Sequence, residues 1–328
     1  MLEPAHSWTT RQGNAFDRSL KMNEMDDLNR TSNGPLVTVV TPSFNQGRFI
    51  RDTIESVLSQ DYPNLEYMII DGGSTDDTLS VLKSYEDRFA WVSEPDRGQA
   101  HAINKGWRGA KGEILAWLNS DDIYQPGAVR IAVDHLMRNP HVGMVYGEGY
   151  LVDESGQPID RYPTDPFDPD RFFERCGICQ PTVFVRRAVI EDVGYVDETL
   201  DFCIDYDLWT RISKKHTVAY LPQYLAKSRL HEECKTIKYR VKAHKEVLDM
   251  LHRHYGFVPP SLLGAYAREV LISYGTPSAP LSKALFFLGM IALGSREFIR
   301  YNSCLPLSEM GRWKRGLAKG VKKMWAEP

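Results

Sequence analysis

The sequence predicts an α/β protein in which helices flank a mostly parallel central sheet and further helices follow. Two observations carry this prediction: short β-branched or apolar runs alternate with stretches of helical length, and polar residues cluster where the apolar runs end. Such alternation is typical of βαβ units. Because the carboxyl ends of parallel strands meet at one edge of a sheet, where ligands bind, the polar clusters predict a binding site at that edge.

The strands of the first half are short and strongly apolar. They are predicted at residues 36–41, 66–71, 90–93, 113–118 and 142–146. Runs of this length, bounded by turn residues, indicate strands that are buried on both faces.

The helices between these strands are predicted from apolar spacing and from capping residues. Apolar residues recur at helical spacing over 50–58. The next helix begins near Ser74 or Asp76, which are both good N-cap types. A third helix covers 98–110, and Pro126 fits the first turn of a fourth.

The second half is less regular. Residues 150–235 are rich in proline and are predicted to form extended loops and short strands, with one helix at 205–214. From Lys238 onward the pattern is helical. Residues 296–328 hold eight Lys or Arg against three Glu, so the end of the chain is basic.

Composition excludes several classes of protein. The 328 residues carry a net charge of −3 and are 42% hydrophobic, which suits one large or two modest domains. A pI near 6.3 argues against a nucleic-acid partner. Five cysteines are too few for a disulfide scaffold. No secretory signal is apparent, and no run reaches the ~20 apolar residues of a membrane span, so we expect a soluble, cytoplasmic protein.

The sharpest motif is Asn119-Ser120-Asp121-Asp122, directly after an apolar strand. Adjacent carboxylates repel each other unless a cation lies between or beside them. A hard divalent ion held by one or two carboxylates and by phosphate oxygens fits this motif. The alternative is a helix N-cap, in which the helix dipole stabilises the carboxylate.

Two further motifs follow strands. In the segment 71–78, adjacent glycines let the backbone turn sharply, and the carboxylate of Asp71 could accept a hydrogen bond from a base. In the segment 94–106, a helix opens at Gly98 and carries Asn104 and Lys105 two turns later, which suits an anionic phosphate. The alternatives are a plain strand–helix turn and an ordinary surface helix with a solvated lysine.

These motifs, in this order, resemble the family 2 glycosyltransferases with the GT-A fold, a Rossmann-like architecture. The resemblance covers about residues 36–240 and is densest over 36–135. It implies a nucleotide-sugar donor, most often a UDP-sugar, with Mg²⁺ or Mn²⁺ and an inverting transfer. It also implies a glycan or lipid-linked acceptor and a place in cell-surface polysaccharide biosynthesis.

The resemblance assigns donor contacts residue by residue. It implies that Thr41, Pro42 and Ser43 line the base pocket, with Asn45 nearby, and that Asp71 contacts the edge of the base. It further implies that Asp96, Gly98, Asn104 and Lys105 lie along the ribose and diphosphate. Asn119, Asp121 and Asp122 belong to the metal motif. Within the metal motif, Asp122 is the expected principal metal ligand, and Asp121 lies nearer the ribose.

The resemblance also places the catalytic base. Asp205 matches the family's base, although Ile204 stands where the family has Glu, and Asp207 is therefore a rival. Asp207 could equally be a charge at the start of a helix.

Three more residues resemble less specific parts of the family's site. Gln180 lies in a segment that faces the acceptor, and Arg229 and His231 lie in a loop that covers the diphosphate. The alternative for Gln180 and His231 is a polar residue satisfied at the surface or in the core.

The predicted organisation has three parts. Residues 1–34 form a mobile polar leader, with a docked arm through Trp8 and Phe16 as the alternative. Residues 35–236 form the catalytic domain, with a nucleotide-sugar half (35–135) and an acceptor half (136–236), and residues 237–328 form a basic helical extension. Apolar residues at 284–293, and Trp313 and Trp325 among basic residues, suggest peripheral membrane contact through 284–328. Packing on the catalytic domain or an oligomer contact is the alternative.

Two other functions compete with the transferase. A sugar-1-phosphate nucleotidyltransferase would need a glycine-rich basic loop after the first strand, where this chain has PSFNQG. A non-catalytic nucleotide-sugar binder would lack a base, whereas Asp205 and Asp207 are both present. The pairs Cys176/Cys179 and His231/Cys234 have the spacing of zinc ligands, but buried thiols are the simpler interpretation.

Overall fold

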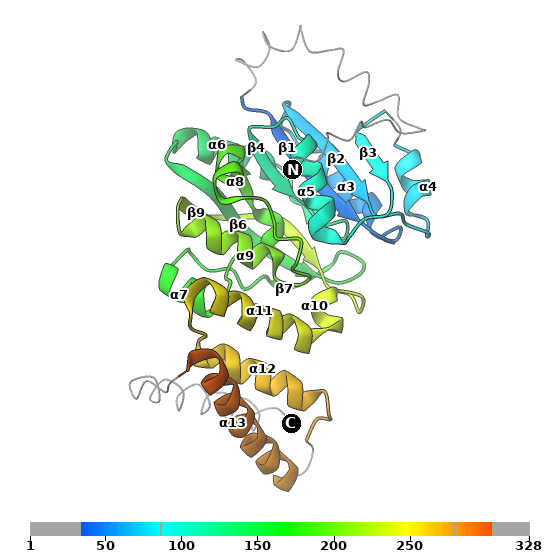
Figure 1. The fold of residues 1–328 in the computed structure, drawn as a ribbon. Helices are drawn as coiled ribbons and strands as arrows, with labels where there is room; N and C mark the ends of the chain where they lie inside the picture. Colours follow the sequence, from blue (N-terminus) through cyan, green and yellow to red (C-terminus); the bar gives the residue numbers. More distant parts are fainter. Residues whose placement is uncertain (1–33, 86, 278–279, 304–328) are drawn as a thin grey trace, which may run out of the picture. The chain divides into compact units, whose positions relative to one another are not determined.

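The computed structural model describes residues 34–85, 87–277 and 280–303. The predicted leader, with Trp8 and Phe16, and the segment with Trp313 and Trp325 lie outside these residues. The chain divides into two compact units, coloured by sequence in Figure 1. The sheet unit contains the chain up to Phe167, Gly177–Thr199 and Arg211–His231; the helical unit contains Asp168–Cys176, Leu200–Thr210 and the chain from Glu232.

The first four strands of the sheet unit are parallel, as predicted. They are β1 (Val37–Ser43), β2 (Leu65–Asp71), β3 (Ala90–Ser93) and β4 (Ile114–Trp117), in the order β3-β2-β1-β4. The register places Ser43 beside Asp71 and Asp71 beside Ser93. Three polar residues therefore form one row at the carboxyl edge of the sheet.

Helices connect these strands. They are α3 (Ile50–Leu58), α4 (Thr78–Lys83), α5 (Gln99–Gly109) and α6 (Ala128–Arg138). The predicted starts of two helices are too early. Helix α4 begins at Thr78, because the Asp76 carboxylate accepts from the Thr78 N–H and hydroxyl and so forms a turn before the helix. Pro126 lies outside α6. The helix begins after Gly127, whose own backbone is in the left-handed region.

Beyond β4 the sheet becomes mixed. Its remaining strands are β5 (Ile123–Tyr124), β6 (Val142–Val152), β7 (Pro158–Arg161), β8 (Phe184–Arg186) and β9 (Thr217–Arg229). Strand β8 is antiparallel to β4 and β6, whereas β9 runs parallel to β6. Strand β9 is 13 residues long, so the expectation of only short strands here is wrong. Pro222 and shifts in register interrupt the alternation of apolar and polar residues along β9, so the spacing of apolar residues does not predict this strand.

The core of the sheet unit fills the space between strands and helices. Val37, Ile54 and Val57 are fully buried in it, and each such side chain stabilises the fold by about 1.5–3 kcal/mol. Helix α5 approaches β1 closely, because a Cβ at Gly106 would lie 2.4 Å from Val40. Short segments η1 (Gln180–Thr182) and α8 (Arg187–Val193) complete the unit.

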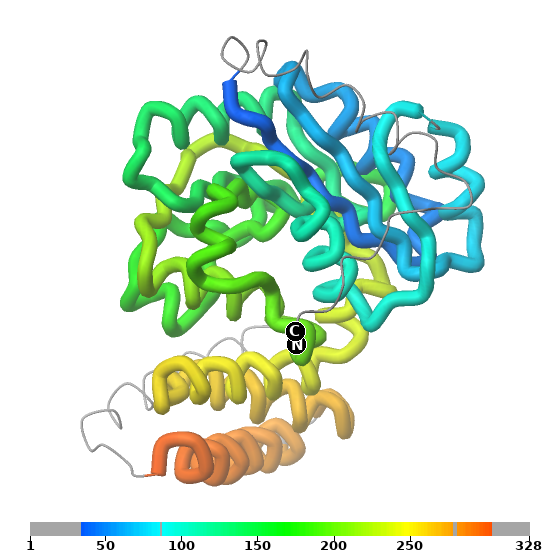
Figure 2. The backbone as a smooth tube through the Cα atoms, turned by 45° about the horizontal axis from the view of Figure 1, so that its top comes forward, coloured from blue at the N-terminus to red at the C-terminus, as the bar shows by residue number. Residues whose placement is uncertain are grey.

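The helical unit contains α7 (Pro169–Glu174), α10 (Lys235–Lys238), α11 (Arg240–Tyr255), α12 (Pro260–Ile272), α13 (Pro280–Asn302) and the first residues of α9 (Ile204–Ser213). The tube in Figure 2 shows α11, α12 and α13 packed in sequence, in yellow to orange. The Tyr301 hydroxyl donates to Asp249 Oδ1 at 2.6 Å and so fixes the end of α13 on α11. In the described part of the chain, no helix has the length and apolarity needed to cross a bilayer.

Candidate active site

Asp71 organises the row of polar residues at the strand ends. The residue is fully buried, and its carboxylate accepts hydrogen bonds from the N–H groups of Gly73 and Ser74 and from the hydroxyls of Ser74 and Ser93. These four donors occupy both carboxylate oxygens. In this arrangement Asp71 shapes the loop after β2, and its predicted contact with a base stays a prediction.

The end of β1 is the other wall of this edge. Thr41 is buried and hydrogen-bonds the Tyr67 hydroxyl at 3.1 Å, and the neighbouring Pro42 is also buried. Ser43 is only 4% exposed, and its Oγ has no hydrogen-bond partner within the described residues. Since buried hydroxyls are almost always paired, the Ser43 hydroxyl is a group that a bound ligand would satisfy.

Asn45 joins this edge to the loop after β2. It has a positive φ of 53°, which Asn tolerates better than most residues. Its N–H donates to Ser74 Oγ at 2.7 Å, and its Oδ1 accepts from the Thr75 N–H at 2.9 Å. The predicted base-pocket residues and the segment 71–78 therefore form one surface.

The segment 94–106 contributes Asp96 and Gly98 to the same edge. Asp96 Oδ1 accepts from the Gly98 N–H at 2.8 Å. Its carboxylate also lies against Gly72, where a Cβ would meet Oδ2 at 2.8 Å. Gly98, at φ 110°, precedes α5 in a conformation that L side chains rarely adopt.

Asn104 and Lys105 make protein contacts. Asn104 is buried, and its side chain bonds the backbone N–H and carbonyl of Val196 at 3.1 and 2.9 Å. Lys105 pairs with Glu94. Asn104 therefore fixes the segment around Val196, and the predicted diphosphate contacts of both residues stay predictions.

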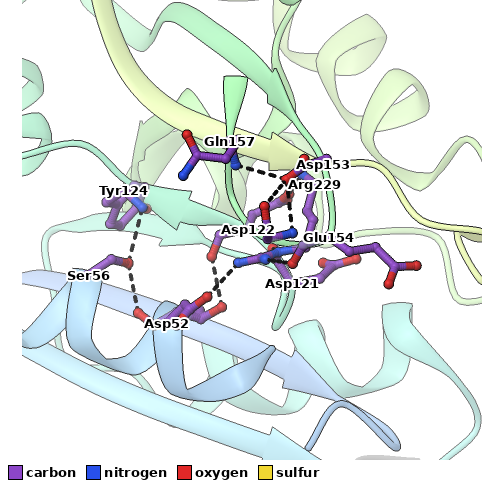
Figure 3. Close-up of polar contacts among 11 residues, drawn as sticks. Asp52, Ser56, Asp121, Asp122, Tyr124, Asp153, Glu154, Gln157 and Arg229 are labelled. Carbon is purple, nitrogen blue, oxygen red and sulfur yellow. Dashed lines mark hydrogen bonds and ion pairs between the residues drawn. The ribbon is translucent and has the colours of Figure 1, made fainter. Parts of the chain in front are cut away.

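Asp122 is anchored from several sides (Figure 3). It is 3% exposed; its Oδ1 accepts from the Arg229 N–H at 3.1 Å, and its Oδ2 accepts from Asn119 Nδ2 at 3.2 Å. The Thr53 hydroxyl donates to its carbonyl at 2.8 Å. Burial and the neighbouring Asp121 carboxylate raise the pKa of Asp122 well above its ordinary value.

Arg229 lies beneath the two aspartates. Its side chain is 1% exposed. The guanidinium donates to the Asp121 carbonyl at 3.0 Å, to Asp52 Oδ2 at 2.7 Å, and to the Glu154 carbonyl. The guanidinium of Arg229 is therefore buried and holds the aspartate loop from behind, and the predicted place of Arg229 in a loop over the diphosphate stays a prediction.

His231 meets Asp121 on the other side of this loop. His231 Nε2 lies 3.0 Å from Asp121 Oδ2, and the ring packs on Phe49 with centroids 4.8 Å apart. The Asp121 side chain keeps 21% of its exposure, whereas that of His231 keeps 2%. Asp121 is thus the more accessible of the two adjacent carboxylates.

Asn119 and Gln180 extend the cluster. Asn119 Nδ2 donates to Gln180 Oε1 at 3.0 Å, and Asn119 Oδ1 accepts from Gln99 Nε2 at 2.8 Å. Gln180 Nε2 donates in turn to the Trp117 carbonyl at 3.0 Å. The structure therefore brings Gln180 into the same network as Asp122, which its distance in the sequence does not suggest.

The candidate base lies in the helical unit, in the first turn of α9. Asp205 is half-buried, and its Oδ1 accepts from the Tyr206 N–H at 2.7 Å. Burial raises the pKa of the Asp205 carboxyl. Asp207 is almost completely buried and lies 2.7 Å from His254 Nε2. The two rivals therefore differ: Asp205 keeps access to solvent, whereas Asp207 is held by a histidine of α11.

Glu246 of α11 fixes the backbone segment that precedes Asp205. Its carboxylate accepts from the N–H groups of Asp201, Phe202 and Cys203 at 2.7–2.9 Å. These are the backbone donors just before α9, so Glu246 serves as a cap supplied from another helix. No local sequence signal identifies it, because at least 43 positions separate it from the residues that it caps.

Comparison with known proteins identifies the family. Residues 38–194 match the family model for glycosyl transferase family 2. A putative teichuronic acid biosynthesis glycosyltransferase of Bacillus subtilis is 32% identical over 204 residues, which are 60% of this chain and 79% of the relative. The chain belongs to glycosyl transferase family 2. The predicted family and enzyme class are thereby confirmed.

This chain spans only part of the length of other relatives. An uncharacterized glycosyltransferase of Rickettsia typhi is 28% identical over 62% of this chain and 67% of the relative. The chain spans 64% of a second one from Rickettsia prowazekii and 35% of one from Rickettsia felis. The chondroitin synthase of Escherichia coli is 28% identical, over 62% of this chain and 30% of its own length.

Solved structures show the fold of the glycosyltransferase. Residues 1–349 of Staphylococcus aureus TarS, in complex with UDP-GlcNAc, superpose with a TM-score of 0.55 at 14% identity, over 79% of this chain and 80% of that one. A mannosyltransferase of Pyrobaculum calidifontis, in complex with GDP-Man and Mn²⁺, gives 0.53 at 19% identity, over 90% and 88%. The predicted GT-A fold with C-terminal helices is confirmed.

The side chains of Asp121 and His231 in the glycosyltransferase are suited to bind a divalent cation. Asp121 Oδ2 and His231 Nε2 already lie 3.0 Å apart, so small shifts would let both atoms bind one ion. Carboxylate oxygen and imidazole nitrogen are both ordinary metal ligands. Cys179, by contrast, packs where a Cβ at Gly149 would meet its Sγ at 2.5 Å, which supports an apolar packing role for this thiol.

Proposed function

We propose that the protein is a metal-dependent, inverting glycosyltransferase that moves a sugar from a nucleoside-diphosphate sugar to a hydroxyl of an acceptor glycan. The observation that carries the proposal is the Asp121–Asp122 loop at the carboxyl edge of the sheet, with Asp121 against His231 and both aspartates fixed by Arg229. Two carboxylates are held here at a position suited to a cation and a diphosphate.

The nucleotide would bind along the edge formed by Ser43, Asn45 and Asp96. The unpartnered Ser43 hydroxyl supports this placement. The positive φ at Gly98 opens the backbone before α5, whose N-terminus favours an anionic group. The donors in the two solved structures named above, UDP-GlcNAc and GDP-Man, belong to this chemical class.

The metal would be held by Asp121 and His231, with Asp122 as the carboxylate that fixes the loop. The geometry favours Asp121 over Asp122 as the principal ligand, because both oxygens of Asp122 already accept hydrogen bonds from the protein. Mg²⁺ or Mn²⁺ bound there supplies a positive charge that offsets charge developing on a leaving diphosphate.

Asp205 would take the proton of the acceptor hydroxyl. A single displacement with one general base inverts the configuration at the anomeric carbon. The half-buried position of Asp205 and its raised pKa suit a base that has to accept a proton near neutral pH.

The acceptor would be a growing glycan. The relatives include a chondroitin synthase of Escherichia coli, a hyaluronan synthase of Pasteurella multocida and a putative teichuronic acid enzyme, all named for polysaccharides. We extend this to a lipid-linked acceptor at a membrane surface, because Leu281, Leu285 and Leu288 of α13 are 60–72% exposed. An oligomer contact through the same face is the alternative.

The test measures donor binding and turnover. The protein is heated with a panel of UDP- and GDP-sugars, with and without Mn²⁺, because a ligand that binds the folded state raises the unfolding temperature. Release of the nucleoside diphosphate is then followed for each stabilising donor. We expect stabilisation and slow release that require the metal. No stabilisation by any donor, or full release in chelator, contradicts the proposal.

A further inference from the structure

A cluster of tyrosines lies on one face of neighbouring strands, outside the residues assigned to the donor. Tyr146, Glu148 and Tyr150 alternate along β6, so their side chains share a face of the sheet. The intervening glycines pack closely on the opposite face, since a Cβ at Gly147 would lie 2.7 Å from Leu225. The face of β6 that carries Tyr146, Glu148 and Tyr150 is therefore aromatic and charged, and the opposite face is occupied by the glycines.

Strand β9 adds two more rings. It pairs with β6 in parallel, with Tyr220 opposite Tyr146 and Tyr224 opposite Glu148. The rings of Tyr150 and Tyr224 stack with centroids 4.0 Å apart and planes 9° from parallel. Tyr224 is 37% exposed. Within the described residues, neither phenol of this stacked pair has a hydrogen-bond partner for its hydroxyl.

Strand β7 supplies a fixed cation beside the rings. Arg161, which pairs with Tyr150 in register, donates to Glu148 Oε2 at 2.7 Å and to the Thr164 carbonyl at 3.1 Å. The Glu148 side chain is 6% exposed, whereas that of Arg161 is 52% exposed. The buried glutamate thus holds an exposed guanidinium in place.

The Tyr220 hydroxyl also donates to Glu148. Burial and this glutamate raise the pKa of Tyr220 to about 12. Tyr220 therefore stays protonated at physiological pH and keeps Glu148 oriented toward Arg161. The role assigned to the donor site does not explain why Glu148 and Arg161 lie beside the stacked tyrosines.

We propose that Tyr150, Tyr224 and Arg161 form a platform that binds a pyranose unit of the acceptor glycan. The inference rests on the proposed function. A pyranose ring has an apolar C–H face, which suits an aromatic ring, and a rim of hydroxyls, which suits a guanidinium and phenol hydroxyls. Tyrosines also lose little conformational entropy on binding, and these two are already ordered by stacking.

The strands connect the platform to the donor site. Strand β9 runs from Tyr224 to Arg229, which holds the Asp121–Asp122 loop. Five residues of strand span about 16 Å at ~3.3 Å per residue. Strand β6 leads from Tyr150 to the turn at Asp153 and Glu154, which also contacts Arg229 (Figure 3). A glycan of several units bound at the platform would therefore reach the donor site along the same strands.

The test measures glycan binding by the full chain. The probes are hexasaccharides of chondroitin, of hyaluronan and of several neutral polysaccharides, followed by saturation-transfer NMR and titration. We expect the protein to bind at least one of them and Tyr224→Ala to weaken that binding about tenfold or more. Tyr224→Phe keeps the ring and should stay within about threefold. Tyr274→Ala, at a tyrosine that is 87% exposed in the helical unit, is the matched control.

The outcomes separate the platform from the proposed function. Binding of none of the hexasaccharides, equal binding by Tyr224→Ala, or an equal loss in Tyr274→Ala overturns the platform. Nucleoside-diphosphate binding in Mn²⁺ should be unchanged by Tyr224→Ala, which also shows that the variant is folded. Glycan binding that depends on Tyr224 in a protein without any donor binding would retain the platform and refute the transferase.

Discussion

Asp122 and Arg229 are joined through the backbone: the Arg229 N–H donates to Asp122 Oδ1 at 3.1 Å, across 107 positions of sequence. The same residue's guanidinium donates to the Asp121 carbonyl. One arginine at the end of β9 therefore fixes both members of the acidic motif. Because its side chain is 1% exposed, Arg229 acts as a positioning residue for the loop.

Replacing Arg229 should weaken the loop. Arg229→Lys keeps the positive charge but loses the planar fork that reaches three acceptors. The Arg229 guanidinium is buried, so losing its hydrogen bonds to the carbonyls of Asp121 and Glu154 should lower the free energy of unfolding by about 1–3 kcal/mol. We expect a lower unfolding temperature and weaker Mn²⁺-dependent binding of a nucleoside diphosphate. Asp52→Asn is the control and should cost less, because Asp52 is 54% exposed. A larger effect of Asp52→Asn would contradict this role.

The two adjacent aspartates should be separable. Asp121→Asn removes an accessible carboxylate and should abolish Mn²⁺ binding with little change in unfolding temperature. Asp122→Asn places an amide NH₂ against donors such as the Arg229 N–H or Asn119 Nδ2, so it should also lower stability by about 1–3 kcal/mol. Calorimetric titration with Mn²⁺ and thermal unfolding of both variants measure this. Full Mn²⁺ binding by Asp121→Asn would return the principal ligand to Asp122.

The base should be identified by separating binding from transfer. Asp205→Asn should abolish transfer and keep donor affinity, because a general base acts only in the transition state. Asp207→Asn should lower stability through its contact with His254, and keep more activity than Asp205→Asn. If Asp207→Asn is inactive with normal donor affinity and Asp205→Asn stays active, Asp207 is the base.

The pH dependence of transfer should report Asp205. Its carboxyl has to be ionised to accept a proton, so activity rises as pH rises through its pKa. Burial raises this pKa, which moves the acidic limb of kcat/KM above the ~3.9 of an unperturbed aspartate. The measurement is a pH–rate profile with donor binding checked at each pH. A limb at or below the ordinary aspartate value would contradict the assignment.

The strands and helices that local spacing of apolar residues determines were predictable. The strands that depend on pairing with a segment far away in the sequence were not. Strands 37–43 and 65–71 and the helix at 50–58 follow from apolar spacing, since each is decided within a few residues. Strand β9 is long because it pairs with β6, and its proline and register shifts hide the alternation. Local pattern carries no information on such pairing.

The same distinction holds in the site. The Asp121–Asp122 motif is visible as adjacent carboxylates after a strand. The burial of Arg229 beneath it, and the cap that Glu246 places on the start of α9, depend on which segments meet in space. The bonds from Asn104 to Val196 likewise join positions 92 residues apart, so no local pattern indicates them, and its predicted diphosphate contact stays a prediction.

Helix α13 allows a last test, of membrane contact. Leu281, Leu285 and Leu288 recur at helical spacing and are 60–72% exposed, so they form one apolar face. The sequence from 296 to 328 carries eight Lys or Arg against three Glu, and each basic residue near an anionic bilayer is attracted by about 1 kcal/mol. We expect the protein to float with anionic liposomes at low salt and to be released at high salt, since salt screens the attraction.

Substitution tests this contact better than truncation. Removing α13 would also remove Tyr301, whose hydroxyl bonds Asp249, and Asn302, which bonds Val258, so the helical unit would be damaged. Replacing the three leucines by Gln should stop flotation while the unfolding temperature stays unchanged, because the changed side chains are exposed. Met137→Gln, at a site 53% exposed on α6, is the control. Unchanged flotation of the triple variant would refute membrane contact through this face, and loss of a dimer in sedimentation would assign the face to a second copy.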